Sequence, residues 1–155
     1  MSQDEVFMRE AIRLSELAVE RGNEPFGAVL VKDGEIVYEN ENQIHTGADP
    51  TFHAEAGLLR RFCAEYKVTD LRDYTLYSSC EPCFMCSGAM VWTKLGRLVY
   101  GASDMDLCGI LNKKGAECCR IVFENSGWKP RVTSGVLRGQ SLEILAAYFK
   151  THEKG

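Results

Sequence analysis

Residues 78–88 read SSCEPCFMCSG, and the spacing of Cys83 and Cys86 within this stretch organises the rest of the chain. Residues three apart lie on one face of a helix, so both sulfurs can reach a single metal ion. Pro82 comes directly before Cys83, and its missing N–H does no harm near a helix start. The partial positive charge of a helix N-terminus also favours thiolate over thiol. The stretch therefore predicts two metal ligands at the beginning of a helix.

A third ligand is available in His53-Ala54-Glu55, thirty residues before Cys83. One imidazole and two thiolates form a borderline-soft donor set, which suits zinc better than magnesium or calcium. Three protein ligands leave a fourth position open for water, as is typical of catalytic zinc sites. Glu55 is two residues from His53, so we expect it beside the metal ion and not as a ligand. A carboxylate there can take a proton from water and pass it to a leaving amine.

Each motif alone also has a plainer interpretation. A histidine and a glutamate separated by one residue occur by chance in many chains. Two cysteines with this spacing can be a redox pair, half of a structural zinc site or two buried thiols. Both motifs occur here in this order, each at a predicted helix start, and that combination favours a catalytic site. We expect one zinc ion per chain, bound by His53, Cys83 and Cys86, with Glu55 as the proton carrier.

Length and composition predict one globular domain that spans residues 1–155. The content of 45% hydrophobic and 26% charged residues is ordinary for such a domain. No apolar run is long enough to cross a bilayer, and the polar start MSQDEVFMRE is unlike a signal peptide. The seven cysteines are then expected to be metal ligands or reduced thiols. We therefore expect a cytoplasmic protein without membrane contact.

The net charge of −4 is divided unevenly, with −7 in residues 1–78 and +3 in residues 79–155. The basic excess of the second half is small, and it contains no dense basic run. A nucleic-acid-binding face is normally strongly basic, so the charge pattern gives little support to such a partner.

Hydrophobic periodicity and turn residues predict helices alternating with strands after an initial hairpin. Helices are expected at 4–21, 53–66, 83–93, 116–124 and 141–152. Strands are expected at 26–31, 35–38, 74–78, 97–101 and 130–136, with Asp33-Gly34 as the hairpin turn. Residues 40–52 are expected to form a loop at the rim of the site, and residues 103–115 also read as loop. This order predicts an α/β fold in which one sheet carries helices on both faces.

At the metal motifs the chain resembles the cytidine deaminase-like superfamily, in the branch of guanine deaminases and tRNA adenosine deaminases. The matching pieces are Pro25–Val29, Asn42, Asp49–Thr51, His53–Glu55, Leu76-Tyr77, Cys80–Cys83, Met85-Cys86 and Gly88-Ala89. The resemblance implies a three-layer α/β/α sandwich around a five-stranded mixed sheet. It also implies hydrolytic removal of an exocyclic amino group from a heterocyclic base, with release of ammonia.

The resemblance also implies roles for individual residues. His53, Cys83 and Cys86 match the zinc ligands, and Glu55 matches the proton shuttle. Asn42 matches an asparagine that hydrogen-bonds the base. The backbone N–H of Ala54 would help to hold the ring, and Phe26 stands where the family lines its pocket. Together with apolar residues Met90, Val91 and Trp92 on the second zinc helix, the resemblance further implies a homodimer.

The choice of substrate remains open between the two groups. Residues 25–27 and 79–83 are more similar to guanine deaminases, whereas residues 97–104 and 133–137 are more similar to tRNA adenosine deaminases. Guanine deaminases carry an acidic stretch with a further catalytic aspartate near residues 109–114, where this chain reads GILNKK. Our leading hypothesis is a zinc-dependent deaminase of a free, guanine-like purine or a related small base or nucleoside. The alternatives are a tRNA adenosine deaminase and a non-catalytic, zinc-stabilised binding module.

Three further residues stand near these motifs. Asp104 and Asp106 are expected in a solvated loop, with contact to the substrate as the alternative. Phe52 departs from the small residue that both groups have before the histidine, and two interpretations remain open. It either reshapes the pocket or packs in the core.

Overall fold

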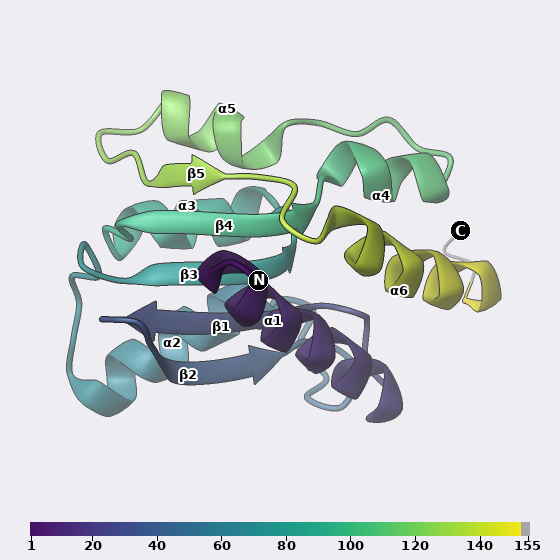
Figure 1. Ribbon diagram of the computed structural model, residues 1–155, viewed down its shortest axis with the longest axis horizontal. Coiled ribbons are helices and arrows are strands. Elements are labelled where there is room, and N and C mark those ends of the chain that lie inside the picture. Colours follow the sequence, from purple (N-terminus) through teal and green to yellow (C-terminus); the bar gives the residue numbers. More distant parts are fainter. Residues whose placement is uncertain (153–155) are drawn as a thin grey trace.

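A computed structural model describes residues 1–152, and it contains a mixed five-stranded sheet in the order β2-β1-β3-β4-β5 (Figure 1). The strands are β1 Gly27–Lys32, β2 Glu35–Glu41, β3 Thr75–Cys80, β4 Arg97–Ala102 and β5 Arg131–Thr133. β1 pairs antiparallel with β2 and β3, whereas β3, β4 and β5 run parallel. The predicted α/β class and five-stranded mixed sheet are therefore confirmed.

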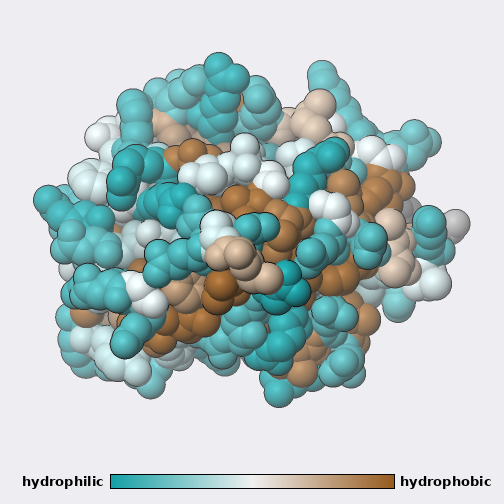
Figure 2. Space-filling model, viewed as in Figure 1, coloured by the Kyte–Doolittle hydropathy of each residue, from teal (hydrophilic) through white to brown (hydrophobic). Residues whose placement is uncertain are grey.

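Helices cover both faces of the sheet, which gives the expected three layers. They are α1 Gln3–Glu20, α2 Ala54–Tyr66, α3 Phe84–Trp92, α4 Asp104–Ile110, α5 Cys118–Glu124 and α6 Arg138–Thr151. In Figure 1, α1 and α6 lie in front of the sheet, and α2 and α3 lie behind it. α5 packs against α3. Figure 2 shows the front face, where hydrophobic residues form a broken band between hydrophilic ones.

The core follows from the two-residue period of the strands. Leu30 and Leu76 point to the α2 and α3 side, where they pack with Leu58. Their neighbours Val29 and Tyr77 point to the opposite side and pack against α1. Since successive residues of a strand face opposite sides, a sheet covered on both faces needs apolar residues at nearly every position. This is why the central strands read as continuous apolar runs.

Local signals in the sequence account for the beginning of the chain. Ser2 and Glu5 form a capping box, with Ser2 Oγ accepting from Glu5 N and Glu5 Oε1 accepting from Ser2 N. Asp33 and Gly34 form the hairpin turn with φ of +52° and +76°. β2 continues to Glu41, three residues beyond the predicted end at Tyr38.

The prediction of loop for residues 103–115 is wrong in its first half, which forms α4. This helix has seven residues and none of them is fully buried; Leu107 and Ile110 pack only partly buried against the core, and so short an apolar pattern is a weak helix signal. Its local signal is a capping box in which Ser103 and Asp106 exchange hydrogen bonds.

Two other boundaries in the second half also differ from the prediction. β5 is limited to Arg131–Thr133, and the ladder is interrupted before Gly135, which adopts a φ of +76°, although Val136 N still donates to Tyr100 O of β4. α6 then begins at Arg138, three residues before the predicted start.

Among residues 1–152, no helix combines the length and the apolar character needed to cross a bilayer.

Asp4 ties the first helix to the sheet. Its carboxylate accepts from Arg97 Nη1 at 3.0 Å and Nη2 at 2.7 Å, and from Tyr77 Oη at 2.6 Å. Arg97 Nη2 also donates to Thr133 Oγ1 on β5. The hydrogen bond from Arg97 holds the pKa of Asp4 below its usual value.

We expect Asp4→Asn to lower the free energy of unfolding by about 1–2 kcal/mol at pH 7, since two-pronged hydrogen bonds to a charged group are lost from a partly buried site. A lowered folded-state pKa stabilises the fold above the unfolded pKa of Asp, and this contribution disappears as the pH falls through the folded value. The difference from wild type should therefore shrink below pH ~4 in urea unfolding curves. Asp70→Asn, at the exposed Asp70–Arg72 pair, is the control and should change stability little. Equal stability of Asp4→Asn and wild type at pH 7 would refute this expectation.

Candidate active site

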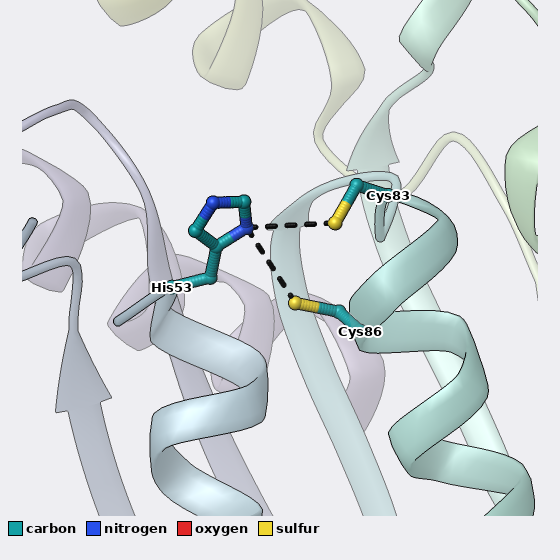
Figure 3. Close-up of side chains that lie close together, drawn as sticks. All are labelled: His53, Cys83 and Cys86. Atoms are coloured by element: carbon teal, nitrogen blue, oxygen red, sulfur yellow. Dashed lines mark hydrogen bonds between the residues drawn. The ribbon is translucent and has the colours of Figure 1, made fainter. Parts of the chain in front are cut away.

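The three predicted metal ligands lie together at the starts of two neighbouring helices (Figure 3). His53 is the N-cap of α2, Cys83 is the N-cap of α3, and Cys86 lies in the first turn of α3. His53 Nδ1 is 3.5 Å from Cys83 Sγ and 3.7 Å from Cys86 Sγ. In Figure 3 the imidazole projects from the α2 side towards both sulfurs. The predicted helix starts are thus confirmed.

These separations match the needs of a zinc ion. Zn–N bonds of about 2.0–2.1 Å and Zn–S bonds of about 2.3 Å, arranged tetrahedrally, separate the ligand atoms by roughly 3.5–3.8 Å. The three ligand atoms all lie within 4.8 Å of one another. Two helix N-termini meet at this point, and both favour thiolate ligands. His53, Cys83 and Cys86 could therefore hold one zinc ion with little rearrangement.

The chain reaches this geometry because both helices start at the same edge of the sheet. β3 ends at Cys80, and only Glu81 and Pro82 separate it from Cys83. α2 packs beside α3, so its first residue lies next to the same edge. In sheets of this kind, ligands bind outside the strand ends, where the helices begin.

Glu55 lies in the first turn of α2, two residues after His53, and is 6% exposed. Burial, and then the nearby Cys83 thiolate, raise the pKa of Glu55 to about 7. Hydrogen bonding from Cys86, and then from His53, lowers the pKa of Cys83 to about 4. The site thus combines a thiolate ready for a metal ion with a carboxyl group that can gain and lose a proton near neutral pH.

A cavity of about 240 Å³ opens over these residues. One part of its wall is polar and contains carboxyl groups together with the metal ligands. The other part is apolar and comes from α4, α6 and the segment before β1. The lining consists of Glu24, Phe26, Asn42, Ile44, His53, Glu55, Cys80, Glu81, Cys83, Asp104, Leu107, Leu111 and Phe149.

The residues expected to contact the substrate lie in or beside this cavity. Asn42 lines it, and its Oδ1 accepts from Ile44 N at 3.1 Å, which orients the amide. Phe26 lines it too, with its ring centroid 6.5 Å from that of Phe149. Ala54 is fully buried as the first residue of α2, where a backbone N–H has no partner within the helix.

Several lining residues were not identified from the sequence. Leu107 and Leu111 fall in the stretch that read as loop, and Phe149 comes from the distant α6. Glu24 stands just before the matched segment that starts at Pro25, and this proximity was the one available signal.

The prediction of a solvated loop is wrong for Asp104, which begins α4 and lines the cavity. Asp104 Oδ2 accepts from Ala116 N at 2.9 Å, and this bond holds the following loop against the helix. Asp106 instead caps α4 and pairs with Arg138. Both contacts of Asp106 are structural.

Phe52 lies outside the cavity, so it does not reshape the pocket over the metal ligands. Its ring packs against Gly57, where an added Cβ would come within 2.8 Å of Phe52 Cε1. The guanidinium of Arg61 lies 4.8 Å from the ring centroid. Phe52 therefore lines a separate surface hollow beside Arg61.

Glu81 connects the metal motif with the segments that cover the cavity. Its Oε1 accepts from Asp104 N at 3.0 Å, and its Oε2 accepts from Cys119 N at 3.3 Å. Glu81 is 8% exposed, so both hydrogen bonds are largely shielded from water. The residue next to Pro82 thus fixes the starts of both α4 and α5.

Several known proteins are similar to this chain. Residues 1–102 match the cytidine and deoxycytidylate deaminase zinc-binding region. The guanine deaminase of Bacillus subtilis (strain 168) is 43% identical over 103 residues, covering 66% of each chain. The tRNA-specific adenosine deaminase of the same strain is 35% identical over 159 residues, covering 99% of this chain and 93% of that protein. A structure of guanine deaminase from Nitrosomonas europaea, 26% identical, covers 93% of this chain and 83% of its own, with a TM-score of 0.80.

Proposed function

Since this chain belongs to the cytidine and deoxycytidylate deaminase zinc-binding family and is a hydrolytic deaminase, we propose that it acts on a free purine or a related small base. In this proposal an exocyclic amino group of the base is replaced by oxygen, and ammonia is released. The third interpretation of the sequence, a non-catalytic zinc module, is set aside because the relatives are deaminases.

The proposed reaction assigns separate tasks to the residues around the cavity. His53, Cys83 and Cys86 would hold the zinc ion. When bound there, zinc supplies a Lewis acid that activates water near pH 7. Glu55 takes the first proton of the attacking water and delivers it to the ring nitrogen next to the reacting carbon. It then takes the remaining proton of the added hydroxyl group and gives it to the amino group, which leaves as ammonia while the carbonyl forms.

The neighbouring side chains would position the base. The Asn42 amide N–H₂ is free of the turn that its Oδ1 makes with Ile44, so it can donate to the ring. Phe26 and Phe149 provide apolar surfaces for a flat heterocycle. The backbone N–H of Ala54, at the start of α2, would add a further donor.

The observation that carries the choice of substrate is the composition of the cavity wall. Four carboxyl groups line it, and none of its described lining residues is Lys or Arg. A phosphate group placed there would meet repulsion without a basic partner. At about 240 Å³ the cavity is also smaller than the roughly 300–1,000 Å³ of typical drug-sized sites, which suits a single base.

A tRNA adenosine deaminase remains the second candidate, and the extent of similarity favours it. The match to the tRNA enzyme of Bacillus subtilis runs through α4, α5 and α6, whereas the match to its guanine deaminase covers 103 residues. For a tRNA substrate, the backbone phosphates would have to bind outside the cavity.

Ammonia release from a panel of amino-substituted bases, their nucleosides and tRNA separates these candidates. We expect turnover of a free base, with a KM that changes less than about threefold between 50 and 200 mM salt. The reason is that a neutral base displaces no counterions, whereas binding through 6–10 phosphates weakens about 10³–10⁵-fold over the same range. Turnover of tRNA alone, with steep salt dependence, would overturn the free-base proposal.

We also propose that the protein forms a homodimer. Its proposed location is the cytoplasm, as the sequence predicts. The sequence predicts Met90, Val91 and Trp92 on the dimer face, and this is wrong for Met90, which is fully buried in the core of the chain. The exposed apolar side of α3 consists instead of Phe84, Met85 and Trp92, and Trp92 is 88% exposed. These residues recur at helical spacing, so they form one stripe that a second copy could cover.

We expect light scattering to give about twice the chain mass of 17.4 kDa for the wild type. Trp92→Lys should yield monomers, because a buried contact would have to hold an unpaired charge. Ile121→Lys, at an exposed position of α5, is the matched control and should stay dimeric. A wild-type protein with the monomer mass at working concentration would refute the dimer.

A further inference from the structure

Glu81 holds the junction between β4 and α4 at two points. Its backbone N–H donates to Ala102 O, at the end of β4, at 2.8 Å. Its side-chain Oε1 accepts from the N–H of Asp104, two residues further along. On the other side, only Pro82 separates Glu81 from Cys83, and the proline ring fixes φ there. The position of α4 is therefore linked directly to one of the predicted zinc ligands.

The two N–H groups that Glu81 receives have no partner within their own helices. Asp104 is the first residue of α4, and Cys119 is the second residue of α5. The first N–H groups of a helix have no carbonyl of that helix to bind. Because the carboxylate is 8% exposed, water competes little for these bonds. Protection of both N–H groups from water thus depends on Glu81.

The two helices differ in how firmly they are packed. α5 buries Cys118, Cys119 and Phe123, and Phe123 belongs to the core cluster that includes residues of α2 and α3. α4 has no fully buried residue, and its Leu107 and Ile110 pack only partly buried beside α6. Glu81 therefore ties a lightly packed helix to a firmly packed one.

The lightly packed helix is the one that reaches the substrate cavity. Asp104 and Leu107 of α4 line it, together with the C-cap residue Leu111. α5, which the structure describes from end to end, supplies no lining residue. Glu55 and the predicted zinc ligands belong to α2, α3 and their N-caps. A movement of α4 would therefore change the wall that faces the base without moving the groups assigned to the chemistry.

We propose, resting on the function proposed above, that Glu81 is a positioning residue for deamination. It fixes the α4 wall relative to the zinc ligands, and through that wall it determines how tightly the base is bound. It takes no part in proton transfer. Glutamine in its place has one acceptor and one donor group, so it can receive only one of the two N–H groups. Because α5 is firmly packed, α4 is the helix that is released.

Glu81→Gln should raise KM about tenfold for the bases that the wild type deaminates, while kcat stays within threefold. A wall that is in place for only part of the time lowers the apparent affinity by that fraction. Binding energy that acts equally on substrate and transition state affects KM alone. Ammonia release from guanine, adenine and 2,6-diaminopurine gives both constants. Zinc content should stay at one ion per chain, since none of the three ligands is changed.

Amide hydrogen exchange, followed residue by residue by NMR, tests the same contact without any substrate. In Glu81→Gln, the N–H of residue 104 should exchange about 10- to 100-fold faster, as for loss of one hydrogen bond to a charged group. The amides of α2 should keep their wild-type rates. A role in overall stability alone would accelerate exchange in all helices together and leave KM unchanged.

Glu117→Gln is the matched control. Glu117 is the N-cap of α5, but its carboxylate pairs with the exposed Arg120 and makes no cap hydrogen bond. This variant should keep the wild-type KM and exchange rates. Three results with Glu81→Gln would each overturn the proposal: a KM raised less than threefold, a kcat lowered more than threefold, or loss of the bound zinc.

Glu81→Asp keeps the test decisive if the glutamine variant does not fold. Its carboxylate is withdrawn by one methylene and cannot reach both N–H groups, so KM should again rise at least threefold, and an unchanged KM would overturn the proposal. Unprotected exchange of the residue 104 N–H in the wild type would overturn it as well. Absence of ammonia from all three bases contradicts the proposed function, while the exchange rates still decide whether Glu81 holds α4.

Discussion

Glu55→Gln is expected to lower kcat by at least about 10³-fold while the protein stays folded and keeps its zinc. Zinc can activate water without this residue, but it cannot carry one proton of the water to the ring nitrogen and the other to the departing amine. General acid–base catalysis contributes on the order of 10²–10⁴-fold, and a group used at more than one step should reach the upper part of that range.

Glutamine keeps the size of the side chain and removes its basic oxygen. Because Glu55 is buried, a neutral amide there should not reduce stability through loss of charge. The measurements are steady-state kinetics, bound zinc and thermal unfolding. Glu65→Gln is the matched control, because it lies on the same helix with its carboxylate at Tyr38 Oη. A zinc-loaded Glu55→Gln protein working within tenfold of wild type would end the assignment of Glu55 as proton shuttle.

Cys83→Ala is expected to abolish measurable deamination, because it removes one of three ligands from an open zinc site. Metal analysis should find one zinc per wild-type chain and far less in the variant. Chelator treatment of wild type should likewise stop turnover, and added zinc should restore it. Zinc should also raise the Tm of the wild type but not that of the variant, since a ligand stabilises only the state that binds it.

Cys63→Ala provides the control for thiol removal. Cys63 lies on α2 outside the cavity, and burial raises the pKa of its thiol. The variant should retain both zinc and activity. Active wild-type protein that contains no zinc would contradict the metal assignment altogether.

Local sequence signals were sufficient for the parts of the fold that depend on near neighbours. The hairpin at Asp33-Gly34, the capping box at Ser2 and the two helices that begin at the metal ligands all follow from residues a few positions apart. The grouping of His53 with Cys83 and Cys86 could be predicted because the two cysteines share a helix start and a catalytic metal site would require one distant partner.

The cavity cover could not be predicted in the same way. α4 has no fully buried residue, and its position depends on Glu81, on the contacts of Asp104 and on partial packing of Leu107 and Ile110 against α6, all of which join residues far apart in sequence. Phe149 reaches the cavity only because α6 packs across the ends of β3 and β4. The difference between Met90 and Trp92 also depends on packing, since both are apolar residues of one helix and only one faces the core.

The two hydrogen bonds of Glu81 have a consequence for how this protein can diversify. They end on the backbone N–H groups of residues 104 and 119, not on side chains. Every amino acid except proline supplies such a donor, so the attachment does not depend on what the cover is made of. Side chains of α4 and α5 can therefore be substituted one by one, which can change the preferred substrate, while Glu81 continues to hold both helices beside the predicted zinc ligands. Substrate selectivity can therefore change while the catalytic residues keep their positions.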